Sequence, residues 1–273
     1  MIQSRVTFWS CCYRAKPEHI ESMRPVFSLA NLRPRNQGLR VRFLAATPLP
    51  KGNHPEQKLI HQIRVTGKKL SASLRLFRPA LGKKRVRLWE DHLSAVTYPL
   101  GKTRNTYVIQ NLLDDIDGKT EIALKKKLPS LATAQILPTK LKRAILVLKT
   151  TKNMLLKEAL PLITTKELIQ ELKRSQKAVF KRAKEAKKNR DSSALHHWRK
   201  AIKRLLFQLE ISSPATASTK KNMKILQKWG HILGEIHDCD ELEKFIKKRP
   251  SSIKNRKVLR EIRQRRDKKI QKL

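Results

Sequence analysis

The sequence predicts an all-α protein: two pseudo-symmetric antiparallel helical bundles around a basic central groove, with a disordered N-terminal extension. Three observations lead to this prediction. Apolar residues recur at helical spacing along most of the 273 residues, and no segment reads as a strand. One basic amphipathic pattern occurs twice. Lys and Arg number 63 against 22 Asp and Glu, so the formal net charge is +41, which indicates a polyanionic partner.

The N-terminal segment differs from the rest of the chain. Residues 1–52 contain five prolines and no sustained periodicity. We therefore predict a disordered extension over residues 1–52 that is dispensable for folding and ligand binding. Residues 53–273 are expected to form one helical domain, with a first half of about 53–162 and a second half of about 163–273.

The first copy of the repeated pattern covers residues 60–77, in a helix that Pro55 opens and Pro79 ends. On a helix its apolar residues share one face: Ile60, Ile63, Leu70, Leu74 and Phe77. The opposite face contains no Asp or Glu and is made of His61, Arg64, Lys68, Lys69 and Arg75. Like charges four residues apart destabilise an isolated helix by about 0.2–0.5 kcal/mol per pair. A basic face without acids therefore indicates an anion that is not part of the chain.

The second copy covers residues 195–211, at an offset of 135 from the first (195 against 60). The positions of His61, Arg64, Lys68 and Lys69 are taken by His196, Arg199, Lys203 and Arg204. We predict that the two helices lie antiparallel or crossed near a local two-fold axis, with their basic faces turned toward a shared concavity. The two histidines could instead be structural residues near a helix start. If they line the site, their ordinary pKa near 6.5 predicts that affinity rises as pH falls through that range.

The remaining helices follow from periodicity and end signals. Between the two copies we expect helices over about residues 85–98, 103–116, 120–127 and 138–148, and an apolar segment at 155–162. Thr164 and Glu167 form the capping box of a long cationic helix that ends near residue 189. After the second copy we expect helices over about residues 222–233, 240–248 and 251–272.

These motifs resemble those of the CHAD family, a histidine-containing α-helical domain. In that family a helix beginning His-x-x-Arg, with a Lys/Arg pair and leucines, occurs twice, and each copy precedes a Leu-Gly turn and an Asp-rich helix start. The second copy here is followed by Leu-Gly at 233–234 and acids at 238 and 240. The first is followed by Leu-Gly at 100–101, with Asn105 and Tyr107 in place of the acids. The resemblance extends from about Pro55 to the C-terminus and implies a helical bundle that binds inorganic polyphosphate through a basic cavity.

We therefore predict non-catalytic binding of inorganic polyphosphate. The predicted site consists of His61, Arg64, Lys68, Lys69, Arg75, His196, Arg199, Lys203 and Arg204. Arginine suits forked contacts to phosphate oxygens, and lysine supplies a compact mobile charge. The alternative is binding to the backbone of duplex DNA or RNA, which the net charge alone would support equally well. Aromatic residues are only 5% of the chain and leave few stacking platforms for single strands. A third hypothesis is an enzyme that processes polyphosphate or nucleotides.

Catalysis finds little support in the motifs. The chain contains neither GxxxxGK[ST] nor GxGxxG, the glycine-rich patterns that cradle nucleotides. Asp114, Asp115 and Asp117 could hold magnesium but more simply close a helix and a turn. The His-Asp-Cys-Asp run at 237–240 could be a metal cluster but is better explained as the N-terminal anchor of the next helix. We expect no enzymatic activity, no cofactor and no metal.

The cellular setting follows from the cysteines and the hydropathy. Three cysteines give no disulfide framework and fit a reducing cytosol. No apolar run approaches the roughly 18 residues of a membrane span. We expect a cytoplasmic protein, with association with polyphosphate granules as a secondary expectation. The oligomeric state is left open.

Overall fold

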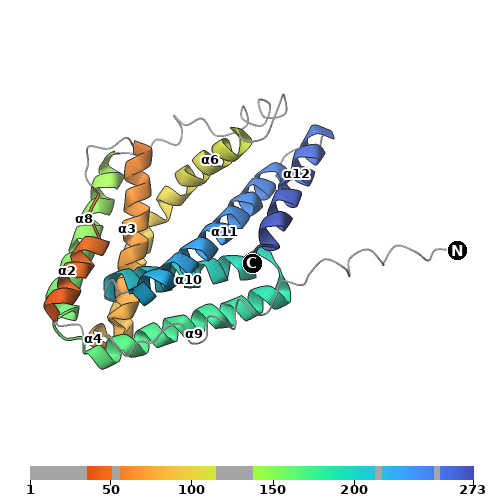
Figure 1. Ribbon diagram of the computed structural model, residues 1–273. Helices are drawn as coiled ribbons and strands as arrows, with labels where there is room; N and C mark the ends of the chain where they lie inside the picture. The colour runs from red at the N-terminus through yellow and green to blue at the C-terminus, as the bar shows by residue number, and fades with distance from the viewer. Residues whose placement is uncertain (1–35, 51–55, 115–137, 213–216, 249–252) are drawn as a thin grey trace.

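The computed structural model describes residues 36–50, 56–114, 138–212, 217–248 and 253–273 (Figure 1). All regular structure in these ranges is helical, and none of it is a strand, so the all-α prediction is confirmed. The helices are α2 (Asn36–Ala46), α3 (Glu56–Leu76), α4 (Arg78–Leu81), α5 (Lys83–Thr97), α6 (Pro99–Asp114), α8 (Pro138–Met154) with the π-helical turn η2 (Leu155–Ala159), α9 (Thr165–Asn189), α10 (Ser192–Ser212), α11 (Ala217–Lys247) and α12 (Ile253–Ile270). Within the described ranges no helix has the length and apolar character that crossing a membrane requires.

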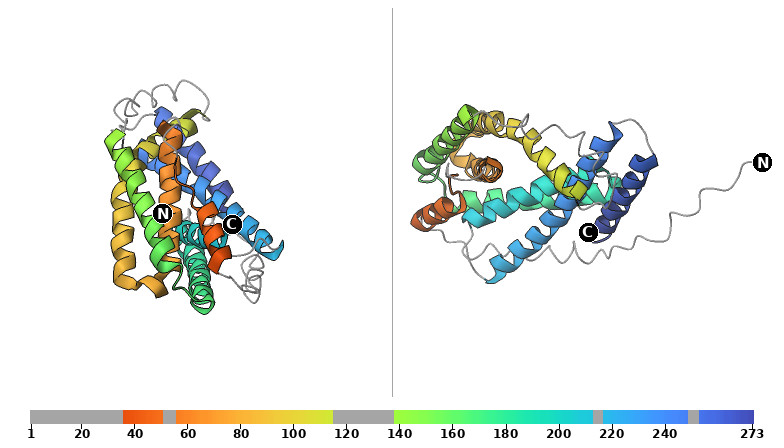
Figure 2. Two further views of the ribbon diagram at one scale, coloured as in Figure 1. Left: turned by 90° about the vertical axis from the view of Figure 1, so that its left-hand side faces the viewer. Right: turned by 90° about the horizontal axis from the view of Figure 1, so that it is seen from above.

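α10 is the central helix of the molecule. It packs against α9, α11, α3 and α2. Figures 1 and 2 show α2, α3 and α8 at one end of the molecule and α12 at the other, with α9 and α10 running between them. The predicted capping box of α9 is present, because Thr164 accepts a hydrogen bond from the backbone N–H of Glu167 while the Glu167 side chain accepts one from the Thr164 backbone.

The two copies of the repeat, α3 and α10, cross at equivalent positions. The side-chain amide of Gln208 donates a hydrogen bond to the carbonyl oxygen of Ala72 at 3.2 Å. At the offset of 135, Ala72 corresponds to Phe207 and Gln208 to Ser73. Each helix therefore meets the other at the same place in its own repeat, as a local two-fold axis through the crossing requires.

A close contact between a glycine and a β-branched residue also occurs in both halves, but the helix that supplies the glycine differs between them. A Cβ atom on Gly67 would lie 2.7 Å from Cγ2 of Thr97, so α3 approaches the end of α5 too closely for a side chain there. In the second half, Ile202 takes the place of Gly67, and Gly230 lies opposite, where a Cβ would meet Cγ2 of Ile202 at 3.5 Å. The repeat thus keeps one glycine at this contact but changes the helix that supplies it.

The N-terminal boundary predicted at residue 52 is wrong for residues 36–50. In α2, Leu39 and Phe43 are fully buried in the main core, and the Phe43 ring meets the Phe77 ring edge-on at 6.0 Å. Arg42 Nε donates to the carbonyl oxygen of Ile211 at 3.3 Å. Lys152 Nζ donates to the carbonyl oxygens of Leu44 and Thr47. Residues 36–50 give no sustained periodicity, and the packing partners of Leu39 and Phe43 lie elsewhere in the chain. Residues 1–35 and 51–52 lie outside the described residues, and there the prediction stays a prediction.

The second half contains one helix where two were predicted. α11 runs without a break through Leu233, Gly234 and Asp240, so the predicted end near residue 233 and start near residue 240 are wrong. Asp240 therefore does not anchor a helix start. It accepts hydrogen bonds from Ser192 Oγ at 2.6 Å and Arg266 Nε at 2.7 Å, and so joins α11 to α10 and α12. The helix predicted at 120–127 lies outside the described residues.

A smaller hydrophobic cluster joins the two halves. Its buried members come from α6, α11 and α12 and are Ile109, Leu113, Cys239, Leu242, Ile246, Val258 and Ile262. α6 belongs to the first half of the chain, whereas α11 and α12 belong to the second. The halves predicted at 53–162 and 163–273 are therefore interlocked and share their packing.

Candidate anion-binding site

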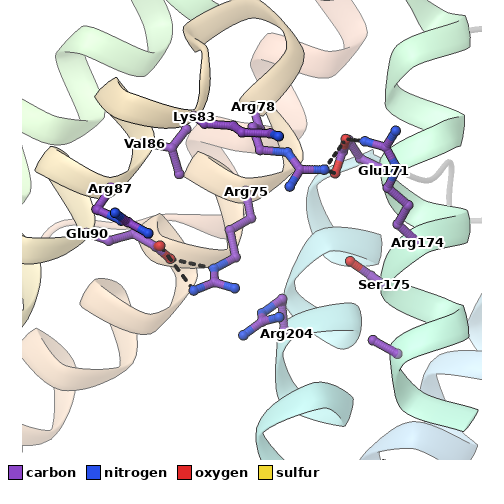
Figure 3. A pocket seen from close by; sticks show the side chains of 11 residues that line it. Arg75, Arg78, Lys83, Val86, Arg87, Glu90, Glu171, Arg174, Ser175 and Arg204 are labelled. Atoms are coloured by element: carbon purple, nitrogen blue, oxygen red, sulfur yellow. Dashed lines mark hydrogen bonds and ion pairs between the residues drawn. The ribbon is translucent and has the colours of Figure 1, made fainter. Parts of the chain in front are cut away.

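A basic pocket of about 440 Å³ lies where the C-terminal end of α3, together with α4, meets α5, α9 and α10 (Figure 3). Six cationic and two acidic residues are among those that line it, which leaves a net charge of +4. The lining residues are Arg75, Arg78, Lys83, Val86, Arg87, Glu90, Glu171, Arg174, Ser175, Ala178 and Arg204. Two of them, Arg75 and Arg204, belong to the predicted site.

The two carboxylates of the pocket hold three of its arginines in place. Glu90 accepts a forked pair of hydrogen bonds from Arg75, at 2.5 Å from Nε and 3.1 Å from a terminal nitrogen. Glu171 is buried and accepts hydrogen bonds from Arg78, at 2.9 and 3.0 Å, and from Arg174. Each arginine still has donors that these bonds do not use, because a guanidinium carries five N–H groups.

Arg204 differs from these arginines in having no ion pair to a described carboxylate, although Glu90 acts on it at longer range. Within the described parts of the chain no ion pair to Arg204 is formed, and its side chain points into the pocket opposite Arg75 (Figure 3). Burial, followed by the positive charge of Arg75, lowers the pKa of Arg204; Glu90 opposes the shift, and Arg182 adds to it. A half-buried guanidinium is costly to desolvate without an opposite charge. The pocket therefore offers an anion a positive charge that no ion pair among the described residues neutralises.

Lys69 lies at the α3–α10 crossing. Its Nζ forms an ion pair with Glu210 of α10 at 2.9 Å and lies 5.6 Å from the centre of the Phe207 ring. Glu210 falls in the second copy at the position that Arg75 holds in the first. The sequence-based prediction missed this acid as a counter-ion of the site, because the comparison of basic positions ended at Lys69 and did not reach Arg75.

His196 forms a cluster with neighbouring residues of α10 and α11. The centroids of its ring and of the His237 ring are 4.4 Å apart. Its Nδ1 is buried with no hydrogen-bond partner among the described residues. Burial first, then the charges of His237, Lys200, Arg199 and His197, lowers the pKa of His196 to about 4. His196 is therefore neutral near pH 6.5 in this fold, and the predicted pH dependence of affinity stays a prediction. The sequence could not show this, because the shift depends first on burial in the fold and then on His237, which is distant in the chain.

The repeated arginines each lie against a glycine of the Leu-Gly motif. Arg64 donates to the carbonyl oxygen of Thr97 at 3.4 Å, and a Cβ on Gly101 would lie 2.8 Å from one of its terminal nitrogens. A Cβ on Gly234 would lie 3.4 Å from a terminal nitrogen of Arg199. Neither glycine forms a turn, since both are inside helices. The motif instead leaves room for the arginine of its own half.

The nine predicted residues fall into three groups. The exposed side chains of His61 and Lys68 lie with Arg64 along the N-terminal part of α3. Lys69, Arg75 and Arg204 lie at the crossing, and only the last two line the pocket. His196, Arg199 and Lys203 lie on α10 toward α11, where burial, followed by the charge of Arg199, lowers the pKa of Lys203 while Glu210 opposes the shift. The pocket does not bring the first and third groups together.

Four basic residues of the pocket were not among those predicted: Arg78, Lys83, Arg87 and Arg174. They come from α4, α5 and α9, outside the repeated motif. The available signal was the pair of acids Glu90 and Glu171, which lie near basic segments and each bind arginines of the pocket. Among the described residues no group of three or more His, Cys, Asp or Glu side chains is arranged to hold a metal ion.

Comparisons with known proteins agree with this fold. Residues 37–247 match the family model described as the CHAD domain, which begins inside α2. The crystal structure of the CHAD domain from the plant Ricinus communis is similar to this chain with a TM-score of 0.57 and 19% sequence identity. The match covers 86% of this chain and 81% of that one, and at this identity it shows the fold alone. None of the curated proteins matches the chain in sequence.

Proposed function

Since this chain belongs to the CHAD family, we propose that it binds inorganic polyphosphate without catalysing a reaction, and that the Arg75–Arg204 pocket holds the anion most tightly. One observation carries the proposal. Arg204 is a half-buried cation that has no ion pair within the described residues and faces a second arginine across a basic pocket. A polyphosphate chain supplies the negative charge that this arrangement lacks.

The shape and chemistry of the pocket favour phosphate groups. Its volume of about 440 Å³ lies within the range of about 300–1,000 Å³ that is usual for ligand pockets. Arginines presented as planar forks suit phosphate oxygens, and Glu90 and Glu171 orient Arg75, Arg78 and Arg174 before any ligand arrives. Affinity should come largely from charge neutralisation and the release of counter-ions, so it should fall steeply with salt.

We propose that a long chain continues from the pocket along α3 and α10. The remaining predicted residues would then contact it at greater distance from the pocket: His61, Arg64 and Lys68 on α3, and His196, Arg199 and Lys203 on α10. A linear ligand suits this arrangement because the two helices diverge from one crossing, with a basic set on each.

The decisive test replaces Arg204 by Gln. The variant should bind labelled long-chain polyphosphate at least about tenfold more weakly, since a hydrogen bond to a charged group contributes about 1.5–3 kcal/mol. The slope of log affinity against log salt should flatten by a little under one unit. Folding should be retained, because the change removes a half-buried like charge. The matched control is Arg256→Gln on the exposed surface of α12. Equal losses in both variants would mean diffuse electrostatic attraction with no site.

Binding to nucleic-acid backbone is the second candidate, and the outer face of α9 is the observation that favours it. Lys173, Lys177, Lys181, Lys184 and Lys188 recur at intervals of three or four residues, all with exposed side chains. Competition between long-chain polyphosphate and duplex DNA, at matched phosphate concentration and across a salt series, separates the two candidates. We expect polyphosphate to displace DNA. Charge reversal at Lys177 and Lys181 should weaken DNA binding more than polyphosphate binding.

Absence of catalysis is tested by product analysis. Polyphosphate incubated with the protein, with and without magnesium and nucleotides, should keep its chain length and release no orthophosphate. Chain shortening that Arg204→Gln abolishes would replace the binding function with an enzymatic one.

A further inference from the structure

The α3–α10 crossing has two sides that the repeat relates to each other. At the offset of 135, Lys69 corresponds to Arg204, and Arg75 corresponds to Glu210. On one side Arg75 and Arg204 face each other across the basic pocket. On the other side the corresponding pair is Glu210 and Lys69, which are 2.9 Å apart. A single exchange of a base for an acid therefore makes one side an open cationic site and the other a closed ion pair.

Glu210 interacts with two lysines of the predicted site. Its carboxylate contacts Nζ of Lys69, and its negative charge also acts on Lys203, about two turns earlier on α10. The Lys69 and Glu210 side chains remain 19% and 22% exposed, so solvent reaches the pair. By the two-fold relation, the Glu210 carboxylate paired with Lys69 occupies the place that an anionic ligand would take on the open side.

We propose that Lys69 anchors a second phosphate-binding site at the crossing that Glu210 keeps closed, its carboxylate standing in for the phosphate group that the Arg75–Arg204 side binds. This inference rests on the proposed binding of polyphosphate. Glu210 then sets how many anion sites the crossing presents: one in the protein as it stands, and two when the carboxylate is neutralised. Access to Lys69 requires the ligand to displace Glu210, which weakens binding there relative to the open side.

The chemistry of the two sides is consistent with this difference. Arg75 is held by Glu90 of α5, whose equivalent position in the second half, counted from the Thr97–Gly230 pair, is Met223. On the open side the acid is Glu90, which lies outside the repeat helices and orients Arg75. On the closed side the acid is in the repeat helix itself, where it neutralises a lysine directly.

The test compares Glu210→Gln with Glu243→Gln. Glu243 is a matched control because its side chain is 17% exposed and forms ion pairs with Lys247 and Arg263 at 3.0 and 2.9 Å on the α11–α12 face. Titration with tripolyphosphate and with long-chain polyphosphate should show tighter binding for Glu210→Gln than for the unaltered protein. The slope of log affinity against log salt should steepen by a little under one unit, so the gain should be about threefold larger at 50 mM than at 200 mM salt. Glu243→Gln should show neither effect.

A second variant, Glu210→Arg, restores the base that the repeat has at position 75. It should raise the tripolyphosphate stoichiometry from one to two per chain. Thermal unfolding separates the proposal from a purely structural role. If Glu210→Gln lowers the melting temperature and binds as the unaltered protein does, Glu210 is a structural ion-pair partner and the proposal is overturned. If the unaltered protein binds no polyphosphate at all, the proposed function fails first, and that outcome is distinct from an unchanged affinity in Glu210→Gln.

Discussion

His61 and His196 hold equivalent positions in the two repeat helices, yet the fold surrounds them differently. His61 is exposed on α3, whereas His196 is half-buried on α10 beside His237. The difference follows from the position of the two helices, because α10 is enclosed by α9, α11, α2 and α3. The repeat preserves the backbone crossing and the arginine–glycine contacts, but it does not preserve exposure. Equivalent residues in the two halves therefore differ in their electrostatics.

The largest expected effect concerns α2, which covers α10. Phe43→Ala should lower the free energy of unfolding by about 3–5 kcal/mol, the usual cost of removing a fully buried phenylalanine ring. Leu44→Ala, one residue further along and 41% exposed, should change it by no more than about 0.5 kcal/mol. Chemical denaturation measures both. If the two variants are equally harmless, residues 36–50 do not contribute to the core and α10 is not enclosed as described.

The next largest difference in stability is expected between alanine substitutions at Gly67 and at Gly230, the glycines of the two equivalent contacts. Gly67→Ala should destabilise the fold by about 1–2 kcal/mol, because Thr97 is fixed by the hydrogen bond that its hydroxyl donates to the carbonyl oxygen of Leu93 at 2.8 Å and cannot easily move away from the new methyl group. Gly230→Ala should be neutral or stabilise by up to about 1 kcal/mol, because the new methyl group would be at ordinary contact distance and alanine favours a helix. The double variant Gly67→Ala with Thr97→Ser should recover most of the loss. Equal effects of the two alanines would contradict the exchanged contact.

The difference between His196 and His61 is tested by measuring the unfolding free energy as a function of pH. The pKa of His196 is about 4 in the folded protein and near 6.5 when unfolded, so the unfolded state binds more protons between these values. Stability from His196 is therefore present above about pH 6.5 and is lost as pH falls toward 4, by roughly 1–3 kcal/mol. His196→Gln should flatten the pH dependence of the unfolding free energy in that window, and His61→Gln should not. Identical profiles for the two variants would mean that the two environments do not differ.

Local signals in the sequence predicted the local features well. Thr164 and Glu167 identify the start of α9 because a capping box is complete within four residues. The repeat at an offset of 135 predicted the crossing of α3 and α10 because it compares positions that the same fold must place equivalently. The family resemblance rested on the same residues, and residues 37–247 match that family.

Features that depend on distant partners could not be predicted in this way. Phe43 gives no helical pattern by itself, and its burial depends on Phe77. The predicted break in α11 relied on Gly234 as a helix-ending signal, whereas its missing side chain makes room for Arg199. The pocket needs Arg78 and Arg174, which meet through Glu171 although Arg78 is 93 residues away from that acid. A motif search confined to the repeat has no access to such contacts.

The small cluster of α6, α11 and α12 has a consequence for synthesis of the chain. Ile109 and Leu113 of α6 are buried against α11 and α12, and Ile262 of α12 lies about 150 residues further along the chain. At about 5–20 residues per second, the ribosome needs roughly 7–30 s to reach that partner. During this interval the apolar face of α6 has no cover from its own C-terminal helices. The nascent chain thus exposes an apolar surface on α6 until α11 and α12 have been synthesised and can pack against it.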